Sequence, residues 1–173
     1  MKKYEFTGET KVIAGVTLKR IRALISFGCV AKGEIGGFIE DEKNLSHDGN
    51  AWVTENAWVT GNARVTGNAW VTGNARVTGN ARVTGNACVT GNARVTDNAD
   101  YMLIGSIGSR NDFTTFYKDI DGGISVKCGC FSGTIEEFRE KVEETHGTNT
   151  KHTKVYQAAA NLAEVQILEQ ETE

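Results

Sequence analysis

"AWVTENAWVTGNARVTGNAWVTGNARVTGNARVTGNACVTGNARVTDN", residues 51–98, repeats a six-residue unit, Ala-x-Val-Thr-Gly-Asn, eight times without a gap. A period of six does not fit an α-helix, because the apolar positions would drift around the helix. It fits a strand of about four residues and a two-residue corner, with Ala and Val on one side. Gly and Asn suit the corner because both tolerate the left-handed backbone conformation. The repeat therefore predicts coils that stack into a solenoid filled by Val and Ala.

The second place of the unit is the variable one, and it holds mainly tryptophan or arginine. If three units make one coil, residues 18 apart stack at a spacing of about 4.8 Å. The variable residues then form three columns, which are Trp52–Trp70–Cys88, Trp58–Arg76–Arg94 and Arg64–Arg82–Asp100. We expect these side chains to face outward, with Arg76 over Trp58 in a cation–π contact.

Two interpretations of these columns stay open. The arginines either keep flat strands soluble and unaggregated or form a strip that binds phosphate, nucleotide or nucleic-acid backbone. The tryptophans either stabilise the ladder by packing or form a partner interface, since stacked outward indoles are a large apolar surface. The candidate binding or interface residues are Trp52, Trp58, Trp70, Arg64, Arg76, Arg82 and Arg94.

The sequence divides into three predicted parts. Residues 1–44 form a β lead-in or cap, and residues 45–104 form the solenoid, in which 45–50 ("LSHDGN") is a degenerate entry unit. Residues 105–173 form a capping module of a hairpin and two helices. The hairpin turns at residues 121–123, and Ile124, Val126, Cys128 and Cys130 alternate onto one face of its second strand.

Two helices are predicted after the hairpin. Thr134 and Glu137 form a capping box at the start of the first, and Gly147 ends it. The second covers roughly residues 151–168. Its expected core-facing stripe is Val155, Ala158, Ala159, Leu162 and Val165.

The composition limits the classes of function that fit this sequence. The net charge of −3, from 19 basic and 22 acidic residues, is too small to imply a nucleic-acid partner, so nucleic acid is possible but not favoured. Residues 51–98 carry four arginines against Glu55 and Asp97, which is 4 − 2 = +2. The sequence shows no signal peptide or membrane span. Its four cysteines have no disulfide-framework spacing, and the pair Cys128 and Cys130 alone is a weak metal signal, so we expect reduced thiols in the cytoplasm, no metal and no membrane partner.

The array resembles the hexapeptide repeat of left-handed parallel β-helix proteins, in which three units make one triangular coil. The resemblance covers residues 51–98 and implies a mainly β fold with 18 residues per coil. Threonine stands where that family often has Gly, Ala, Asp or Glu. Such proteins are commonly trimers packed along one helix face. The resemblance thus implies a homo-oligomer, a trimer rather than a dimer, that self-associates along the Trp52–Trp70–Cys88 column.

The whole layout is similar to bacterial and prophage proteins without an assigned activity. They share the lead-in "GGFIE…NLSHDGNA", the Asn-Ala-x-Val array and the ending "IGSRN…FTTFY…CGCFSG…EEF…ETHG". This similarity implies a phage-encoded protein in the cytosol of a bacterial host, and inhibition of a host system is one form its action would take.

Two functions remain open. The favoured one is a non-catalytic scaffold or binding protein that engages a host protein or an anionic ligand and needs no cofactor. The alternative is an acyltransferase that uses acetyl-CoA or another acyl-CoA, as many left-handed β-helix enzymes do, with a histidine as general base. The array contains no histidine, so the weak catalytic candidate is His47, ahead of His146 and His152.

Overall fold

The computed structural model describes residues 1–169, which form two compact units. The first runs from Met1 to Asn98, and the second begins at Ala99. The first unit is a parallel β-solenoid of about three turns with the lead-in packed on its end. The second is an antiparallel sheet with two helices.

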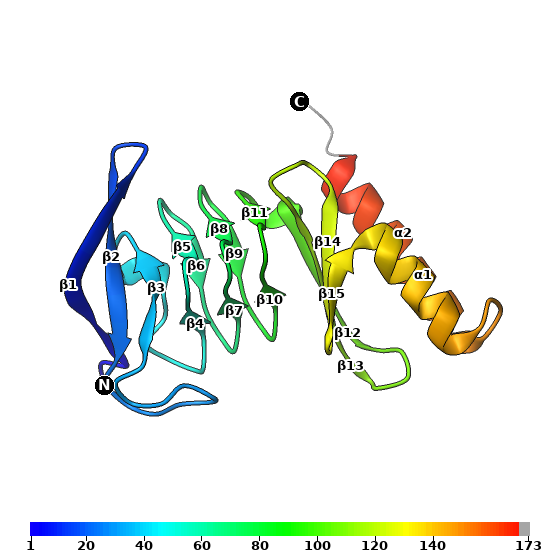
Figure 1. Ribbon diagram of the computed structural model, residues 1–173, viewed down its shortest axis with the longest axis horizontal. Helices are drawn as coiled ribbons and strands as arrows, with labels where there is room; N and C mark the ends of the chain where they lie inside the picture. Colours follow the sequence, from blue (N-terminus) through cyan, green and yellow to red (C-terminus); the bar gives the residue numbers. More distant parts are fainter. Residues whose placement is uncertain (170–173) are drawn as a thin grey trace. The chain divides into compact units, whose positions relative to one another are not determined.

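The solenoid is built from very short strands, one in each repeat unit (Figure 1). They are β4 (Trp52–Val53), β5 (Trp58–Val59), β6 (Arg64–Val65), β7 (Trp70–Val71), β8 (Arg76–Val77), β9 (Arg82–Val83), β10 (Cys88–Val89) and β11 (Arg94–Val95). Strands three units apart pair in parallel, so that Trp52 lies opposite Trp70 and Trp58 lies opposite Arg76. The predicted coil of 18 residues is therefore confirmed.

The inside of the solenoid is filled by the two small apolar residues of the unit. Every repeat Ala and Val from Ala51 to Val95 is at most 1% exposed. Burying one valine side chain stabilises the fold by about 1.5 kcal/mol. The repeat therefore supplies a continuous core, as its alternation predicts.

The corners differ from the prediction in one respect. The repeat glycines do take positive φ, for example 66° at Gly61 and 69° at Gly73, but none of the repeat asparagines does. The asparagines instead stack, and the Asn50 amide donates to the Asn68 side chain, which donates to Asn86. Asparagine therefore serves the corner through a ladder of side-chain hydrogen bonds, while the left-handed backbone comes from glycine and, in the first repeat unit, from Glu55 with a φ of 56°.

The lead-in extends one of the solenoid sheets. It contains β1 (Tyr4–Ile13), β2 (Val16–Ala23), β3 (Ile35–Ile39) and a 3₁₀ turn, η1 (Glu42–Asn44). β1, β2 and β3 pair antiparallel, and β3 then pairs in parallel with β5, which gives the continuous order β1-β2-β3-β5-β8-β11 (Figure 1). Gly36 is needed here, because a Cβ at this position would lie 2.7 Å from the Trp52 ring.

The third column is shorter than expected. It consists of β6 and β9, which place Arg64 opposite Arg82. Asp100, predicted to continue it, lies instead in a second 3₁₀ turn, η2 (Asn98–Asp100), and is buried. The repeat ends at residue 98, and residues 98–100 form this turn in place of a further strand of the column.

The second unit is a four-stranded antiparallel sheet followed by two helices. Its elements are β12 (Tyr101–Ile107), β13 (Asp112–Lys118), β14 (Ile124–Cys128), β15 (Phe131–Thr134), α1 (Ile135–His146) and α2 (Lys151–Leu168). The predicted hairpin is the β13–β14 pair. The predicted capping box of Thr134 and Glu137 is present, and Gly147 ends α1.

Two details of this unit correct the sequence analysis. Cys130 does not share the inward face of β14, because the strand ends at Cys128 and Cys130 lies exposed in the following turn. On α2, Leu162 and Val165 point to solvent and are 52% and 53% exposed. The buried face is offset from the expected stripe and consists of Thr153, Tyr156, Ala159, Ala160, Ala163 and Ile167.

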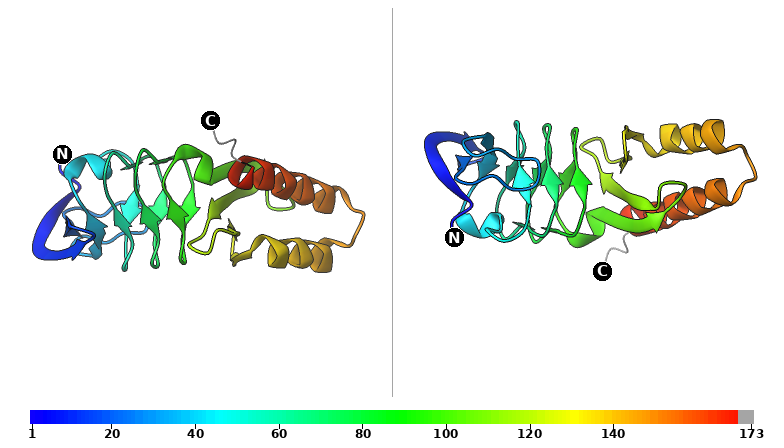
Figure 2. Two further views of the ribbon diagram at one scale, coloured as in Figure 1. Left: turned by 90° about the horizontal axis from the view of Figure 1, so that it is seen from above. Right: turned by 90° about the horizontal axis from the view of Figure 1, so that it is seen from below.

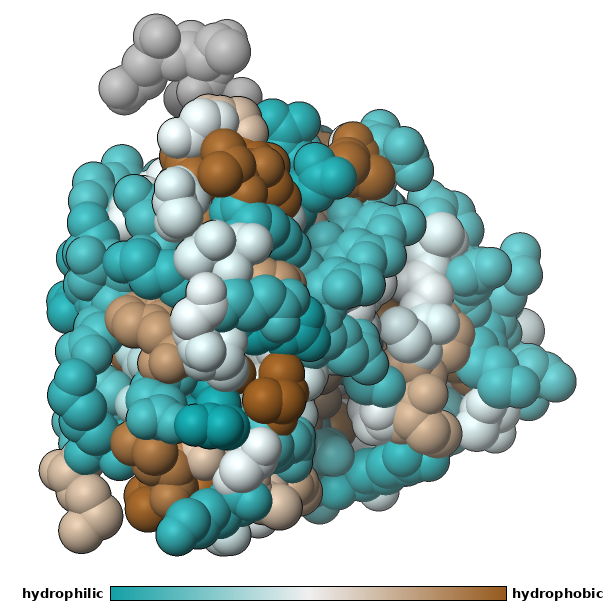
Figure 3. All heavy atoms as spheres, turned by 60° about the vertical axis from the view of Figure 1, so that its left-hand side comes forward, coloured by the Kyte–Doolittle hydropathy of each residue, from teal (hydrophilic) through white to brown (hydrophobic). Residues whose placement is uncertain are grey.

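The face of the molecule drawn in Figure 3 is mostly hydrophilic. Figure 3 shows one face on which the hydrophobic residues form small, separate patches. All four cysteines are free. Within residues 1–169, no helix is long and apolar enough to cross a membrane.

Candidate binding surface

The longest ladder of outward side chains runs along the sheet that joins the lead-in to the solenoid. Parallel pairing places Phe38 opposite Trp58, Trp58 opposite Arg76, and Arg76 opposite Arg94. The two views of Figure 2 show these strands stacked coil on coil. The Arg76 guanidinium lies 5.9 Å from the centre of the Trp58 ring, which confirms the predicted cation–π contact.

The lead-in adds residues to this ladder that sequence reasoning missed. Lys11 Nζ lies 3.9 Å from the centre of the Phe38 ring, and the Arg20 guanidinium lies 4.9 Å from it. Phe38 is only 5% exposed because these cations and their stems cover it. The missed signal was the pair Phe38–Ile39, which repeats the aromatic–aliphatic pattern of β5. It stands 20 rather than 18 residues before Trp58, and the 3₁₀ turn η1 falls within this longer interval.

The arginines form two exposed columns. Arg76 and Arg94 lie side by side on β8 and β11, and Arg64 and Arg82 lie side by side on β6 and β9. All four are exposed. Neighbouring strands are about 4.8 Å apart, so each column presents two like charges from adjacent strands.

The tryptophan column is not the exposed surface that the sequence analysis expected. Trp52 is 0% exposed, because Tyr4 and Phe27 of the lead-in pack edge-on against its ring at centroid distances of 6.4 and 5.4 Å. Phe27 comes from the loop between β2 and β3, which lies at the edge of the first coil (Figure 1). Trp70 and Cys88 are half-buried in the same sheet. The expected outward pair of tryptophans therefore reduces to Trp70.

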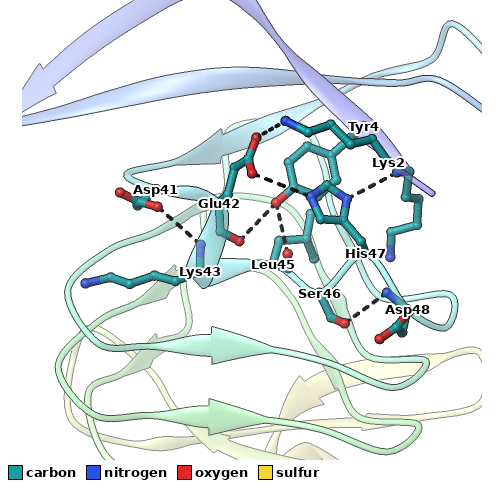
Figure 4. A network of polar contacts seen from close by, with 10 residues as sticks. Lys2, Tyr4, Asp41, Glu42, Lys43, Leu45, Ser46, His47 and Asp48 are labelled. Atoms are coloured by element: carbon teal, nitrogen blue, oxygen red, sulfur yellow. Dashed lines mark hydrogen bonds and ion pairs between the residues drawn. The ribbon is translucent and has the colours of Figure 1, made fainter.

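His47 is held in a network of contacts at the start of the solenoid (Figure 4). Its ring stacks on Tyr4 at a centroid distance of 4.3 Å, and its Nδ1 accepts a hydrogen bond from the Lys3 backbone N–H at 3.1 Å. Nε2 faces the Glu42 carboxylate at 3.9 Å. Because the Nδ1 lone pair is occupied, neutral His47 carries its proton on Nε2 and offers no free lone pair to a substrate. This geometry suits a packing role and argues against a general base.

Two further groups in this network are buried and titratable. The Lys3 ammonium donates to the carbonyl of Ala51 at 2.8 Å and lies over the Phe27 ring. Burial lowers the pKa of Lys3 to about 8, against the opposing effect of Asp48. Tyr4 donates its hydroxyl to the Leu45 carbonyl at 2.9 Å. Burial, helped by the Glu42 charge, raises the pKa of Tyr4 well above its usual value.

The second unit contains a cavity of about 400 Å³ beside its sheet and helices. Its lining includes Arg110, Lys141, Cys128, Cys130, His146 and Tyr156. The Arg110 guanidinium lies 3.8 Å from Cys130 Sγ, and this contact lowers the pKa of the thiol below its usual value. Gly129 allows this approach, because a Cβ there would meet the Arg110 side chain at 2.5 Å. The sequence analysis gave no role to Arg110, which no motif marks.

The two histidines of this unit pack near each other. His146 stacks on Tyr156 at 5.9 Å, and the His152 ring lies 5.5 Å from His146. In the part of the chain that the structure describes, no three His, Cys, Asp or Glu side chains are placed to hold a metal ion.

Comparison with known proteins adds no assignment. No protein-family model matches the chain, and no curated protein matches it. Fold alone does not fix function, so the function has to be argued from the exposed ladders described above.

Proposed function

We propose that the protein is a non-catalytic scaffold or binding protein whose arginine columns engage an acidic surface of a partner protein. The observation that carries this proposal is the parallel register of Arg76 with Arg94 and of Arg64 with Arg82. We further propose that the solenoid is of the left-handed hexapeptide-repeat type. The similarity to prophage proteins supports a phage-encoded protein that acts on a host protein.

The rigidity of the solenoid favours this function. Each arginine is fixed at its Cα by a strand whose neighbours on the coil are fully buried, so the columns are preorganised before a partner arrives. The conformational entropy lost on binding is then limited to that of the arginine side chains. A ladder of this kind presents charge at a regular spacing of about 4.8 Å, the distance between neighbouring strands of a sheet.

The acyl-CoA-dependent alternative has less support. It requires an unoccupied histidine lone pair, and the Nδ1 atom of His47 already accepts the Lys3 N–H. A nucleic-acid partner would use the same arginines, so the experiment compares an acidic polypeptide with DNA.

The experiment measures binding of fluorescent poly-L-glutamate and of a single-stranded DNA 20-mer by anisotropy at low and moderate salt. We expect poly-L-glutamate to bind and its affinity to fall as salt rises, because exposed charges are screened. The double variant Arg76→Glu/Arg94→Glu should lose most of this binding, and Arg64→Glu/Arg82→Glu should weaken it.

The matched control is Lys32→Glu/Lys43→Glu, which changes the net charge equally at exposed positions outside the columns. Equal losses for the control and the arginine variants would refute a specific column. If only the DNA binds, the partner of the arginine columns is a nucleic acid and not an acidic protein. If neither probe binds, the proposal is wrong.

A further inference from the structure

Helix α2 carries a second apolar stripe that the described residues of its own unit, up to residue 169, leave uncovered. Leu162 and Val165 are 52% and 53% exposed, Ala158 is exposed, and Val155 is half-buried. The opposite face of α2 packs into the core of its own unit. The helix is therefore apolar on two faces, and among the described residues of this unit only one face is packed against a core.

The stripe has the spacing of a helix-pairing seam. It begins at Lys151 and continues through Val155, Ala158 and Leu162 to Val165, with alternating steps of four and three residues, and the C-cap residue Glu169 follows four residues later. This average period of 3.5 is the one by which two helices bury a shared apolar seam along their length. A helix that only faces solvent has no need of it.

The stripe is also complementary to itself when reversed. If a second α2 lies antiparallel across a two-fold axis, Lys151 of each copy meets Glu169 of the other. Val155 then meets Val165, and Ala158 meets Leu162, so a small side chain faces a large one at the centre. A two-fold interface requires this reciprocity, in which residue i contacts j and j contacts i.

We propose that α2 is a self-association surface and pairs antiparallel with α2 of a second copy of this chain. The charges at the two ends of the stripe favour a second copy of α2 as the partner and favour the antiparallel orientation. Within residues 1–169, neither Lys151 nor Glu169 forms an ion pair inside its own chain. A parallel arrangement would bring lysine to lysine and glutamate to glutamate, whereas the antiparallel one pairs opposite charges at both ends. This dimer does not rest on the arginine columns, and it replaces the trimer expected along the tryptophan column.

The first test measures mass by sedimentation equilibrium of the full chain over a wide concentration range. We expect reversible association from the 18.7 kDa chain to a species of twice that mass. Leu162→Glu should raise the dissociation constant at least tenfold, because it places two carboxylates in the centre of the seam. The control Val12→Glu introduces the same charge at an exposed apolar residue of β1 and should leave association unchanged.

The second test swaps the end charges and does not touch the apolar residues. Lys151→Glu and Glu169→Lys should each weaken association several-fold, since each turns both ion pairs into repulsions. The double variant Lys151→Glu/Glu169→Lys should restore association, and an equimolar mixture of the two single variants should form heterodimers. Circular dichroism checks that every variant stays folded.

Three results would overturn the proposal. They are a chain that stays monomeric at millimolar concentration, an oligomer that Leu162→Glu does not weaken, and a double charge-swap variant that fails to recover association. None of these outcomes bears on poly-L-glutamate binding, so failure of the dimer and failure of the proposed function are told apart.

Discussion

The guanidinium of Arg76 lies over the indole of Trp58 from the preceding coil, 5.9 Å from the ring centre. Arg94 occupies the same place one coil further on, but its strand neighbour is Arg76. We therefore expect a double-mutant cycle of Arg76→Gln and Trp58→Leu to give a coupling energy of about 0.5–1 kcal/mol in the free energy of unfolding. A double-mutant cycle of Arg94→Gln and Trp58→Leu should give a coupling energy near zero. Equal coupling energies in the two cycles would contradict a specific contact between Arg76 and Trp58.

Two corner glycines allow backbone strain to be separated from crowding. Gly73 and Gly91 have φ of 69° and 64°, but a Cβ at Gly73 would lie 2.9 Å from Gly91 N, whereas a Cβ at Gly91 meets nothing within 4 Å. We expect Gly91→Ala to destabilise by about 1 kcal/mol through the left-handed backbone alone. Gly73→Ala should cost about 2 kcal/mol or more, because the coils must also separate. Urea unfolding measures both losses of stability. Identical losses would show that the close approach of neighbouring coils at Gly73 does not affect stability.

The buried Lys3 gives stability a pH dependence of known sign. Its pKa is about 8 in the folded protein and 10.5 ordinarily, so the unfolded chain binds more protons between these values. The free energy of unfolding should therefore rise with pH from about 8 to 10. Tyr4, whose pKa is raised by burial, acts in the opposite direction above pH 10, where the unfolded chain ionises first. Lys3→Met should flatten the slope between pH 8 and 10, and an unchanged slope would assign it to other groups.

Cys130 should be the most reactive thiol of the exposed pair Cys29 and Cys130. The Arg110 guanidinium lowers the pKa of Cys130, so a larger fraction is thiolate at neutral pH. We expect iodoacetamide at pH 7 to modify Cys130 several-fold faster than Cys29, as read by peptide mass spectrometry. Arg110→Gln should remove most of the difference, whereas Lys127→Gln, which removes a smaller contribution to the same pKa shift, should change it less. Equal rates in the unaltered protein would refute the thiolate assignment.

Periodicity was sufficient to predict the solenoid and its columns. Val and Ala point inward in every unit, and Trp58 and Arg76 fall in register, because a strict repeat leaves one way to stack its coils. The capping box at Thr134 and Glu137 was equally readable, because it is made by residues close in the chain. Local and periodic signals therefore predicted most of the backbone arrangement.

The errors arose where non-repetitive segments meet the repeat. Trp52 reads as an outward residue of the first coil, but Phe27 covers it, and no local pattern indicates where a loop will lie. On α2 both stripes are apolar, so periodicity could not tell that Leu162 faces solvent and Ala163 the core. The contact between Arg110 and Cys130 joins residues 20 apart in two different turns, the β12–β13 turn and the β14–β15 turn, and it depends on tertiary packing alone.

The register of eighteen residues also bears on how such a chain changes over generations. Because interior coils are interchangeable, a tandem duplication in the gene that adds three units inserts one whole coil and leaves every existing neighbour in place. The first and last coils would then move apart by about 4.8 Å for each duplication. Slippage by one or two units would instead rotate everything downstream by a third or two thirds of a turn. Duplication of three units therefore changes the length of the solenoid in steps of one coil. Variants of different length can then arise while the segments at both ends of the array keep their sequence.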